Sequence, residues 1–554
     1  MTLIKLLFLK TKKNGVFVIK CSGTLILGPI FDCFSVIDCL MFNNKMRMCA
    51  PSLVIRLKNN FVCVAPVSRK SSEMTQKQEV LFTLKKIGDN LNIDSVKKDS
   101  SCNTLTSGKQ QKLVAVAPIK SEYVLLDKQR ELNLTYVSNT IKNEFVKNNE
   151  VGDEPPLKKI KGYDEDPEKN KLTKELQVKL RKRLFYFDKT EEPLKKVNSK
   201  EYLKYKNETA DDSEKIKLRL EERKKVDFKG KLYLAPLTTV GNLPFRRICK
   251  EFGADVTCGE MAMATNLLQG QMSEWALLRR HSSEDIFGIQ LCGGHADVMS
   301  RCAQLLQEQC NVDFIDINMG CPIDFIFKKG SGSGLMNHTN KVNEIVFAMT
   351  EASDIPLTLK MRAAVQEGRN IAHKIIEDLK PWANRISLFT VHGRSREQRY
   401  TKLANWNYIG ECARAAYPQI PLFGSGDILS YEDYETNRRN FGVDGILLAR
   451  GALIKPWIFT EIRERRHWDI SSLERLELLK KYVNYGLDHW GADTEGIERI
   501  RRFLLEWLSF LHRYIPVGLL EVLPQRINDR PPSYRGRDDL ETLMASPSCA
   551  DWIR

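Results

Sequence analysis

The stretch "VDFIDINMGCP", residues 312–322, decides the fold class of this chain. It begins as an apolar run typical of a buried strand and ends in a small loop in which Gly320 and Pro322 flank Cys321. Glycine permits a tight backbone approach, and proline stiffens a turn. A core cysteine needs no such presentation, whereas a reactive cysteine does. The stretch therefore predicts a buried strand that delivers a functional side chain at its C-terminal end.

Seven more stretches of this kind, each followed by a helical pattern, flank residues 312–322. The eight predicted strands are residues 231–236, 254–259, 286–291, 314–318, 357–362, 386–393, 421–426 and 445–450. The helices predicted to follow them are residues 243–253, 266–281, 295–310, 341–353, 369–382, 406–417, 430–442 and 455–465. This alternation predicts an α/β fold of the (β/α)8 TIM-barrel class. A doubly wound open sheet is the alternative, which the absence of a GxGxxG turn after the first strand disfavours.

The pattern changes on both sides of this barrel. Residues 1–228 are rich in polar and charged runs that bury too little apolar surface to fold, so we expect a long, largely disordered basic region that becomes helical towards its end. Two amphipathic helices are predicted near the C-terminus, at residues 472–490 and 496–515. The expected organisation is thus a basic region over 1–228, a barrel over 229–468 and a small all-helical domain over 469–554.

The formal net charge of +16 over 554 residues comes almost entirely from residues before Val226. Basic arms bind polyanions, of which nucleic acid is the commonest, and the alternative is a solvated arm without a partner. The 14 cysteines include no CxxC pair, which is typical of a reducing compartment without a disulfide framework. Every histidine lies at His281 or later, so no Cys-Cys-Cys-His zinc finger can form ahead of the barrel, and we expect no metal site.

The first 45 residues are apolar in patches, but charged residues such as Lys5, Lys20 and Asp32 interrupt them. No uncharged apolar run of about 20 residues survives, so we expect no membrane association through a spanning helix. A signal peptide fits poorly because no apolar core leads to a cleavage site, whereas a transit peptide stays open. We expect a cytoplasmic location, a nuclear location, or both.

In barrels of this class the active site lies at the C-terminal ends of the strands. The predicted strands deliver several polar side chains to that end, namely Gln290, Asn318, Cys321, Lys360, Arg362, His392 and Arg394. The loops 424–427 and 449–451 follow strands seven and eight, where this fold usually binds phosphate. Each of these residues has a structural explanation when taken alone, but their convergence at one end predicts an organic cofactor with a phosphate tail and a polar ring system.

Several motifs, in this order, resemble the tRNA dihydrouridine synthase family. They include "LAPLTTVGNLPFRRICKEFGADVTCGEMAMATNLLQG", "DFIDINMGCPIDFIFKKGSGSGLMNH", "TVHGRSREQRYTKLANW" and "LLARGALIKPWIFTEI". The resemblance extends over about residues 229–554 and is strongest to the eukaryotic branch that modifies uridine 47 of tRNA. It implies an FMN-bearing barrel that reduces the 5,6 double bond of a uracil in tRNA, with NADPH or NADH as the reductant.

The resemblance also implies roles for individual residues. The residues that match the family's FMN contacts are Pro236, Leu237, Thr238, Gln290, Lys360 and His392, with Ser425, Gly426, Asp427, Ala449 and Arg450 on the phosphate side. Cys321 matches the family's proton donor. Hydride then goes to C6 of the uracil and the proton from Cys321 goes to C5, which answers why a strand should present a cysteine in this way.

The substrate base must leave its stack to reach a flat cofactor. Candidates for substrate contacts are Asn318, Arg362, Arg394, Arg396 and Arg399, and further candidates for RNA phosphates are Lys328, Lys329, Arg499, Arg501 and Arg502. For each basic residue the alternative is a solvated surface. We expect tRNA as the partner of a monomer, with messenger RNA as a further candidate substrate.

The chain departs from the family pattern at Ser425, where the family usually has Asn, at Ser333, where it commonly has Cys, and in lacking the zinc fingers that usually precede the barrel. Two other functions therefore stay open. One is a flavin barrel of the dihydroorotate type that acts on a small pyrimidine. The other is an RNA-binding protein without catalysis, which the presence of Cys321 and Lys360 disfavours.

Overall fold

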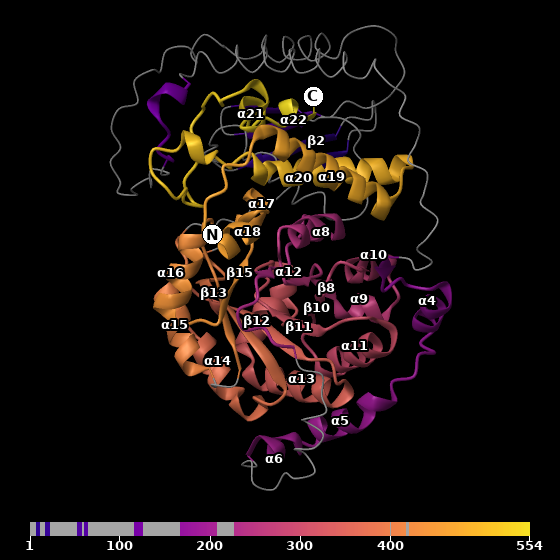
Figure 1. Ribbon diagram of the computed structural model, residues 1–554. Coiled ribbons are helices and arrows are strands. Elements are labelled where there is room, and N and C mark those ends of the chain that lie inside the picture. Colours follow the sequence, from indigo (N-terminus) through magenta and orange to yellow (C-terminus); the bar gives the residue numbers. More distant parts are fainter. Residues whose placement is uncertain are drawn as a thin grey trace. The chain divides into compact units, whose positions relative to one another are not determined.

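The computed structural model describes residues 7–10, 17–22, 53–57, 60–64, 116–125, 167–207 and 226–553, except 399, 401 and 417–419 (Figure 1). The chain forms two compact units, Met1–Gln111 and Lys112–Arg554. In the first unit an antiparallel sheet has the strand order β1 (Leu7–Lys10), β2 (Phe17–Ser22), β4 (Asn60–Val64) and β3 (Leu53–Leu57). This sheet was not predicted, and most of the region predicted to be disordered lies outside the described residues.

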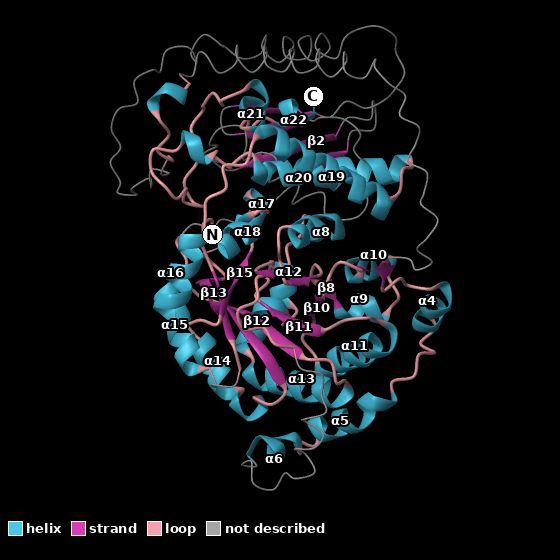
Figure 2. Ribbon diagram, in the orientation of Figure 1, coloured by secondary structure: helices cyan, strands magenta, loops and turns pink. Residues whose placement is uncertain are grey.

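A closed parallel barrel of eight strands forms the centre of the second unit (Figure 2). Its strands, in spatial and chain order, are β6 (Tyr233–Leu234), β7 (Val256–Cys258), β10 (Ile286–Cys292), β11 (Phe314–Met319), β12 (Leu357–Ala364), β13 (Ile386–Ser395), β14 (Leu422–Ser425) and β15 (Gly445–Leu448). Pairing of β15 with β6 closes the ring. The predicted TIM-barrel class is confirmed, and each predicted strand lies at its predicted place.

Aromatic side chains fill one end of the barrel interior. Tyr233, Phe314 and Phe423 come from three different strands, and Phe228 packs edge-on against Phe314 with ring centroids 5.3 Å apart. A Cβ at Gly288 would lie 2.2 Å from the ring of Phe314, so only glycine leaves room for this ring. Because side chains alternate along a strand, the same inward face continues to the C-terminal ends of these strands.

Helices cover the outside of the barrel, as Figure 1 shows. They are α8 (Leu243–Glu251), α11 (Ala296–Gln309), α13 (Thr339–Ala352), α14 (Ala372–Asp378), α15 (Trp406–Ala415), α16 (Tyr431–Phe441) and α18 (Ile458–Glu464). The helix predicted over 266–281 is wrong as a single element. It is divided into α9 (Ala264–Leu268), α10 (Met272–Trp275), a 3-10 turn and the short strand β9 (Arg280–His281). Gly270 adopts φ +64° and ends the first of these pieces.

The segment 167–207 packs along the barrel and includes β5 (Glu168–Lys169), α4 (Lys174–Arg181), α5 (Asp188–Asn198) and α6 (Tyr202–Asn207). Strand β5 pairs with β9, and the buried side chain of Asn170 donates to the carbonyl of Leu278 at 2.9 Å. The ring of Tyr202 packs against Phe347 of α13, with ring centroids 5.9 Å apart and the planes tilted by 37°. The charged helical character predicted towards the end of the N-terminal region is thus found over 174–207, and this part belongs to the barrel unit.

The C-terminal part is helical, with α19 (Ser472–Trp490), α20 (Thr494–Leu511), α21 (Asp539–Met544) and α22 (Cys549–Ile553). A capping box formed by Ser471 and Glu474 starts α19. The indole of Trp507 on α20 donates to the carbonyl of Leu453 at 3.0 Å and packs edge-on against Phe245 of α8. Buried apolar and polar contacts therefore hold the helical part on the barrel.

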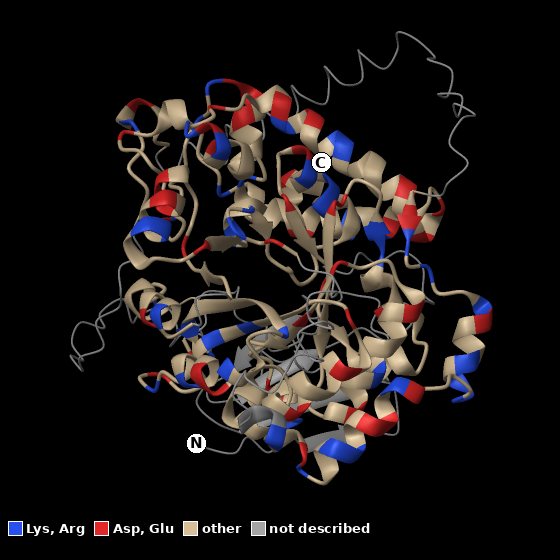
Figure 3. Cartoon of the chain, turned by 60° about the horizontal axis from the view of Figure 1, so that its bottom comes forward, with Lys and Arg blue, Asp and Glu red and all other residues tan. Residues whose placement is uncertain are grey.

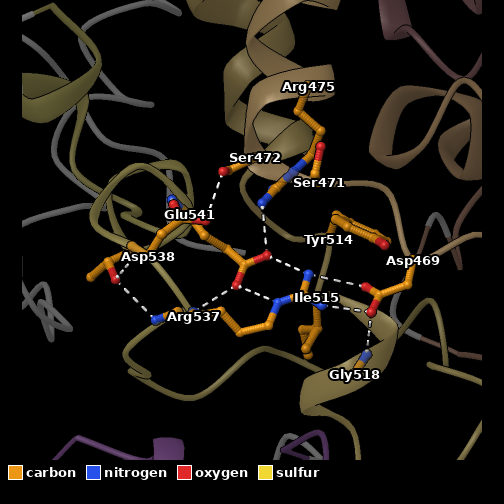
Figure 4. A network of polar contacts seen from close by, with 12 residues as sticks. Asp469, Ser471, Ser472, Arg475, Tyr514, Ile515, Gly518, Arg537, Asp538 and Glu541 are labelled. Carbon is orange, nitrogen blue, oxygen red and sulfur yellow. Dashed lines mark hydrogen bonds and ion pairs between the residues drawn. The ribbon is translucent and has the colours of Figure 1, made fainter.

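A network of charged side chains, of which Glu541 and Arg475 are buried, joins the two ends of this helical part (Figure 4). The carboxylate of Glu541, which is fully buried, accepts from the backbone and guanidinium of Arg537, and lies 3.5 Å from the guanidinium of Arg475. Arg537 also pairs with Asp469 at 2.6 Å, and Ser472 donates to Asp538 at 2.8 Å. These contacts fix α21 against the start of α19.

Candidate active site at the C-terminal end of the barrel

The strand register places the predicted polar residues side by side at the C-terminal end of the barrel. Successive register pairs across β11 to β14 are Asn318 with Lys360, Lys360 with Thr390, Arg362 with His392, and His392 with Ser425. Along its own strand, each of these residues lies two or four positions after a side chain that points into the barrel. All of them therefore also point inward, on the C-terminal side of the aromatic residues. The structure thus brings together the side chains that the sequence predicted to converge.

A chain of hydrogen bonds connects buried side chains of β10, β11 and β12 and ends at the loop that carries Cys321. The buried carboxylate of Asp316 accepts from the hydroxyl of Thr358 at 2.6 Å and from Nε2 of Gln290 at 2.7 Å. The amide oxygen of Gln290 accepts from Nδ2 of Asn318 at 2.8 Å. Asn318 Oδ1 in turn accepts from the backbone N–H of Cys321 at 2.9 Å. We call this chain the Asp316 relay; it connects three neighbouring strands and positions Cys321.

Further contacts hold the loop that carries Cys321. The backbone N–H of Gly320 also donates to Asn318 Oδ1, at 3.1 Å, and Nε of Arg362 donates to the carbonyl of Gly320 at 2.7 Å. The hydroxyl of Ser333 donates to the carbonyl of Cys321 at 2.7 Å. The thiol side chain stays partly exposed. Serine at position 333 thus supplies a hydrogen bond to the cysteine loop, and Asn318 Oδ1 and Arg362 Nε also bind this loop.

Lys360 and His392 have shifted pKa values. Burial lowers the pKa of Lys360, and the charge of Asp316 opposes that shift. Burial, with the nearby charges of Arg362, Lys360 and Arg394, lowers the pKa of His392 well below its usual value, so the imidazole is neutral at pH 7. The ammonium of Lys360, with the charge of Asp316 nearby, is a cation that can bind a ligand at this point.

On the other side of the barrel mouth, Asp427 organises the loops after β13, β14 and β15. Its carboxylate accepts from Nη2 of Arg394 at 2.7 Å, from Nη2 of Arg450 at 2.6 Å and from the backbone N–H of Ala404 at 2.9 Å. The ring of Tyr400 lies 4.3 Å from the guanidinium of Arg450 and is 57% exposed. Tyr400 was not among the predicted site residues, because no spacing rule distinguishes it from other loop aromatics.

The remaining cofactor candidates lie at the same mouth. Pro236, Leu237 and Thr238 follow β6, where Thr238 is exposed and the carbonyl of Leu237 accepts from Gly241 at 3.1 Å. Gly426 follows β14, and Ala449 precedes the short helix α17 (Arg450–Ile454). These loops therefore lie at the same end of the barrel as Lys360 and His392.

The arginines predicted to contact RNA differ in accessibility. Arg394 is completely buried by its partners, so a direct contact with RNA phosphate requires it to leave Asp427. Arg396 pairs with Asp324 and donates to the carbonyl of Pro322 at 3.2 Å. Arg399 lies outside the described residues. These basic residues could be named from the sequence, but the ion pairs that Arg394 and Arg396 form within the chain could not.

Lys328, Lys329, Arg499, Arg501 and Arg502 are exposed. Arg499 and Arg501 form ion pairs with Glu495 and Glu498 of the same helix. Figure 3 shows acidic and basic residues interspersed along the helices. Over the described residues, no group of three His, Cys, Asp or Glu side chains is arranged to hold a metal ion. The helices seen in the described ranges are also too short or too polar to cross a membrane.

The sequence model of the dihydrouridine synthase (Dus) family matches residues 233–509, and the chain belongs to this family. It is 59% identical over 409 residues to the tRNA-dihydrouridine(47) synthase (NAD(P)(+))-like protein of Xenopus tropicalis, a match that covers 70% of this chain and 63% of the relative. It is 64% identical over 343 residues to the human protein of the same name, covering 62% and 52%. The chain thus matches about half to two thirds of the length of these relatives, and the resemblance inferred from the motifs is confirmed at the level of the family.

We expect the Asp316 relay to produce an acid limb in the pH dependence of turnover. Burial raises the pKa of Asp316 to about 6, against the opposing effect of the hydrogen bonds from Thr358 and Gln290. As pH falls through that value, Asp316 takes up a proton and Lys360 loses its counter-charge, so the rate should fall. Since the folded pKa is raised, protonation of this group favours the folded state, and the limb does not report unfolding.

Replacement of Asp316 by Asn tests this expectation, because Asn can still accept from Gln290 but does not titrate. We expect Asp316→Asn to lower turnover and to remove the limb near pH 6, measured as kcat over about pH 5 to 8. Thr358→Val, which removes a neighbouring hydroxyl without changing the titrating group, is the control and should keep a limb. An unchanged limb in Asp316→Asn would assign it to another group.

Proposed function

We propose that this chain is a flavin-dependent tRNA-dihydrouridine synthase that reduces the 5,6 double bond of uridine 47. The observation that carries the proposal is the position of Cys321, held by Asn318 and Arg362 beside Lys360 at the active-site end of a dihydrouridine synthase barrel. The barrel over 229–468 is the proposed catalytic domain, and the helical part over 469–554 is the proposed tRNA-binding domain. We also propose that the protein acts as a monomer in the cytoplasm, the nucleus or both.

The residues at the barrel mouth fit FMN. The ammonium of Lys360 can pair with an anionic edge of the flavin ring, and neutral His392 can donate or accept a hydrogen bond. Arg450, with the loops at Ser425–Asp427 and at Ala449, offers a cation and backbone groups for the phosphate tail. Bound FMN, reduced by NADPH or NADH, would supply the hydride that adds to C6 of the uracil.

The chain's own residues supply orientation and the proton. Addition of hydride at C6 leaves negative charge on C5 and O4 of the uracil, and a proton must then reach C5. The Cys321 thiol, partly exposed on its fixed loop, is the donor in this proposal. The Asp316 relay orients the donor, so that the geometry exists before the substrate arrives.

The test is product formation from unmodified tRNA by the purified chain. With FMN and NADPH present, dihydrouridine should appear on nucleoside mass spectrometry, and omission of either should abolish it. A parallel incubation with a free pyrimidine such as orotate should give no reduced product. Reduction of orotate but not of tRNA would favour the dihydroorotate-type alternative, and failure to retain flavin would favour an RNA-binding protein without catalysis.

A further inference from the structure

A small exposed platform follows Cys321 directly in the chain. Residues 323–329 contain α12 (Asp324–Lys328), and we call them the α12 platform. Phe325 is 62% exposed and Ile323 is 53% exposed. The ammonium of Lys329 lies 4.1 Å from the ring centroid of Phe325 and occupies one face of that ring. More than half of the surface of Phe325 thus remains open to a ligand.

The platform is held rigidly although its outer side chains are exposed. Ile326 is buried, and its carbonyl accepts from the backbone N–H of Ser331 at 3.2 Å. Arg396 reaches across from the end of β13, pairs with Asp324, and places its guanidinium 4.1 Å from the ring of Phe327. Because both neighbours of Phe325 in the chain are fixed, this ring is presented in a defined position beside the mouth of the barrel.

The composition of the α12 platform fits a single-stranded nucleic acid. Exposed aromatic rings bind unpaired bases by stacking, and nearby lysines bind phosphates. Lys328 and Lys329 are exposed, whereas the carboxylate of Asp324 is paired with Arg396, so the local charge is positive. A uridine that leaves its stack to reach Cys321 leaves neighbouring bases unstacked at this rim.

We propose that Phe325 stacks on an unpaired base of the tRNA next to the target uridine, while Lys328 and Lys329 contact the adjoining phosphates. This inference rests on the proposed function. The stacked base holds the strand so that the flipped uridine remains at the Cys321 loop. Phe325 thus contributes to the binding of tRNA and has no part in the redox steps.

Phe325→Ala should raise the KM for tRNA by about 5- to 150-fold, the range for loss of one base–aromatic stack. The rate of flavin reduction by NADPH in the absence of tRNA should not change. Phe325→Leu keeps an apolar side chain without a ring and should behave like Phe325→Ala, whereas Phe325→Trp should retain wild-type KM. Tyr186→Ala, which removes a 72% exposed aromatic from the loop between α4 and α5, is the matched control and should have no effect.

Phe325→Trp also gives a readout that is independent of turnover. Stacking should quench the fluorescence of the added tryptophan when tRNA is titrated, relative to the same titration of the wild type. Quenching without any dihydrouridine from the wild type would contradict the proposed reaction and support the platform. Two results would contradict the proposed role of Phe325 without contradicting the proposed reaction. One is dihydrouridine formation by Phe325→Ala with an unchanged KM for tRNA. The other is an equal KM for tRNA in Phe325→Leu and Phe325→Trp.

Discussion

Replacement of Cys321 by Ala is expected to lower the rate of dihydrouridine formation by about 100- to 10,000-fold, the usual contribution of a positioned general acid. The loop is held through backbone groups, since Asn318 and Ser333 contact the N–H and the carbonyl of Cys321. The alanine variant should therefore keep the loop in place and lose the proton donor alone. Single-turnover measurements with the reduced, tRNA-saturated protein check this expectation.

Two controls separate loss of the donor from loss of the fold. Flavin content and the rate of flavin reduction by NADPH should be equal in the wild type and Cys321→Ala, because the thiol takes no part in that half of the reaction. Cys321→Ser retains a small polar group but is a far weaker acid, and should stay close to the alanine variant. A rate within tenfold of the wild type in both variants would show that another group, or water, delivers the proton.

Replacement of Arg246 by Met is expected to lower the free energy of unfolding by about 3–5 kcal/mol, the range for stranding one member of a buried ion pair. Arg246 and Glu284 are both almost completely buried, with Nε 2.7 Å from Oε1. Arg246 also donates to the carbonyls of Gly241 and Arg279, and Thr257 donates to Glu284. The pair connects α8 to the segment before β10, and its loss leaves a carboxylate with too few partners.

The pH dependence gives this prediction a second test. Burial acts to raise the pKa of Glu284, but the charge and hydrogen bonds of Arg246 overcome it, so the folded pKa lies below its ordinary value. The stabilisation is thus present above the unfolded pKa and is lost as pH falls through the folded pKa. In Arg246→Met the carboxyl of Glu284, left without its partner, can take up a proton. The difference in free energy of unfolding between the wild type and Arg246→Met should therefore become smaller as pH falls from 7 towards about 4.5.

Urea denaturation of the wild type and Arg246→Met, at pH 7 and at about pH 4.5, measures this difference in the free energy of unfolding. The matched control is Arg501→Met, since Arg501 and Glu498 form an exposed pair on α20 and such pairs contribute about 0–1 kcal/mol. A deficit in Arg246→Met no larger than that of the control would contradict the assignment of this pair as a main support of the barrel.

The barrel could be predicted from the sequence because each strand–helix unit carries its own local pattern. The strand "FIDIN" and the helix 472–490 depend on period and capping residues close in the chain, and both were found at their predicted places. The helix predicted over 266–281 failed because Gly270 interrupts a pattern that is otherwise helical. The short helix α12 was missed because five residues carry too little periodicity.

The side chains of the site could be named from the sequence, but their partners could not. Asp316 resembles any polar residue in a strand until the register places it beside Gln290 and Thr358. Arg394 was predicted to contact the substrate, whereas its complete burial against Asp427 depends on two loops that meet only in the fold. Cross-strand contacts of this kind are set by register, which local patterns do not specify.

The most direct test of the central claim is position-specific. Two transcripts of one tRNA, with uridine or cytidine at position 47, are incubated with the purified chain, FMN and NADPH, and fragments containing position 47 are analysed by mass spectrometry. The account predicts a gain of two hydrogens at position 47 in the uridine transcript and no dihydrouridine in the cytidine transcript. No gain at position 47 from protein that retains flavin and is reduced by NADPH would contradict it.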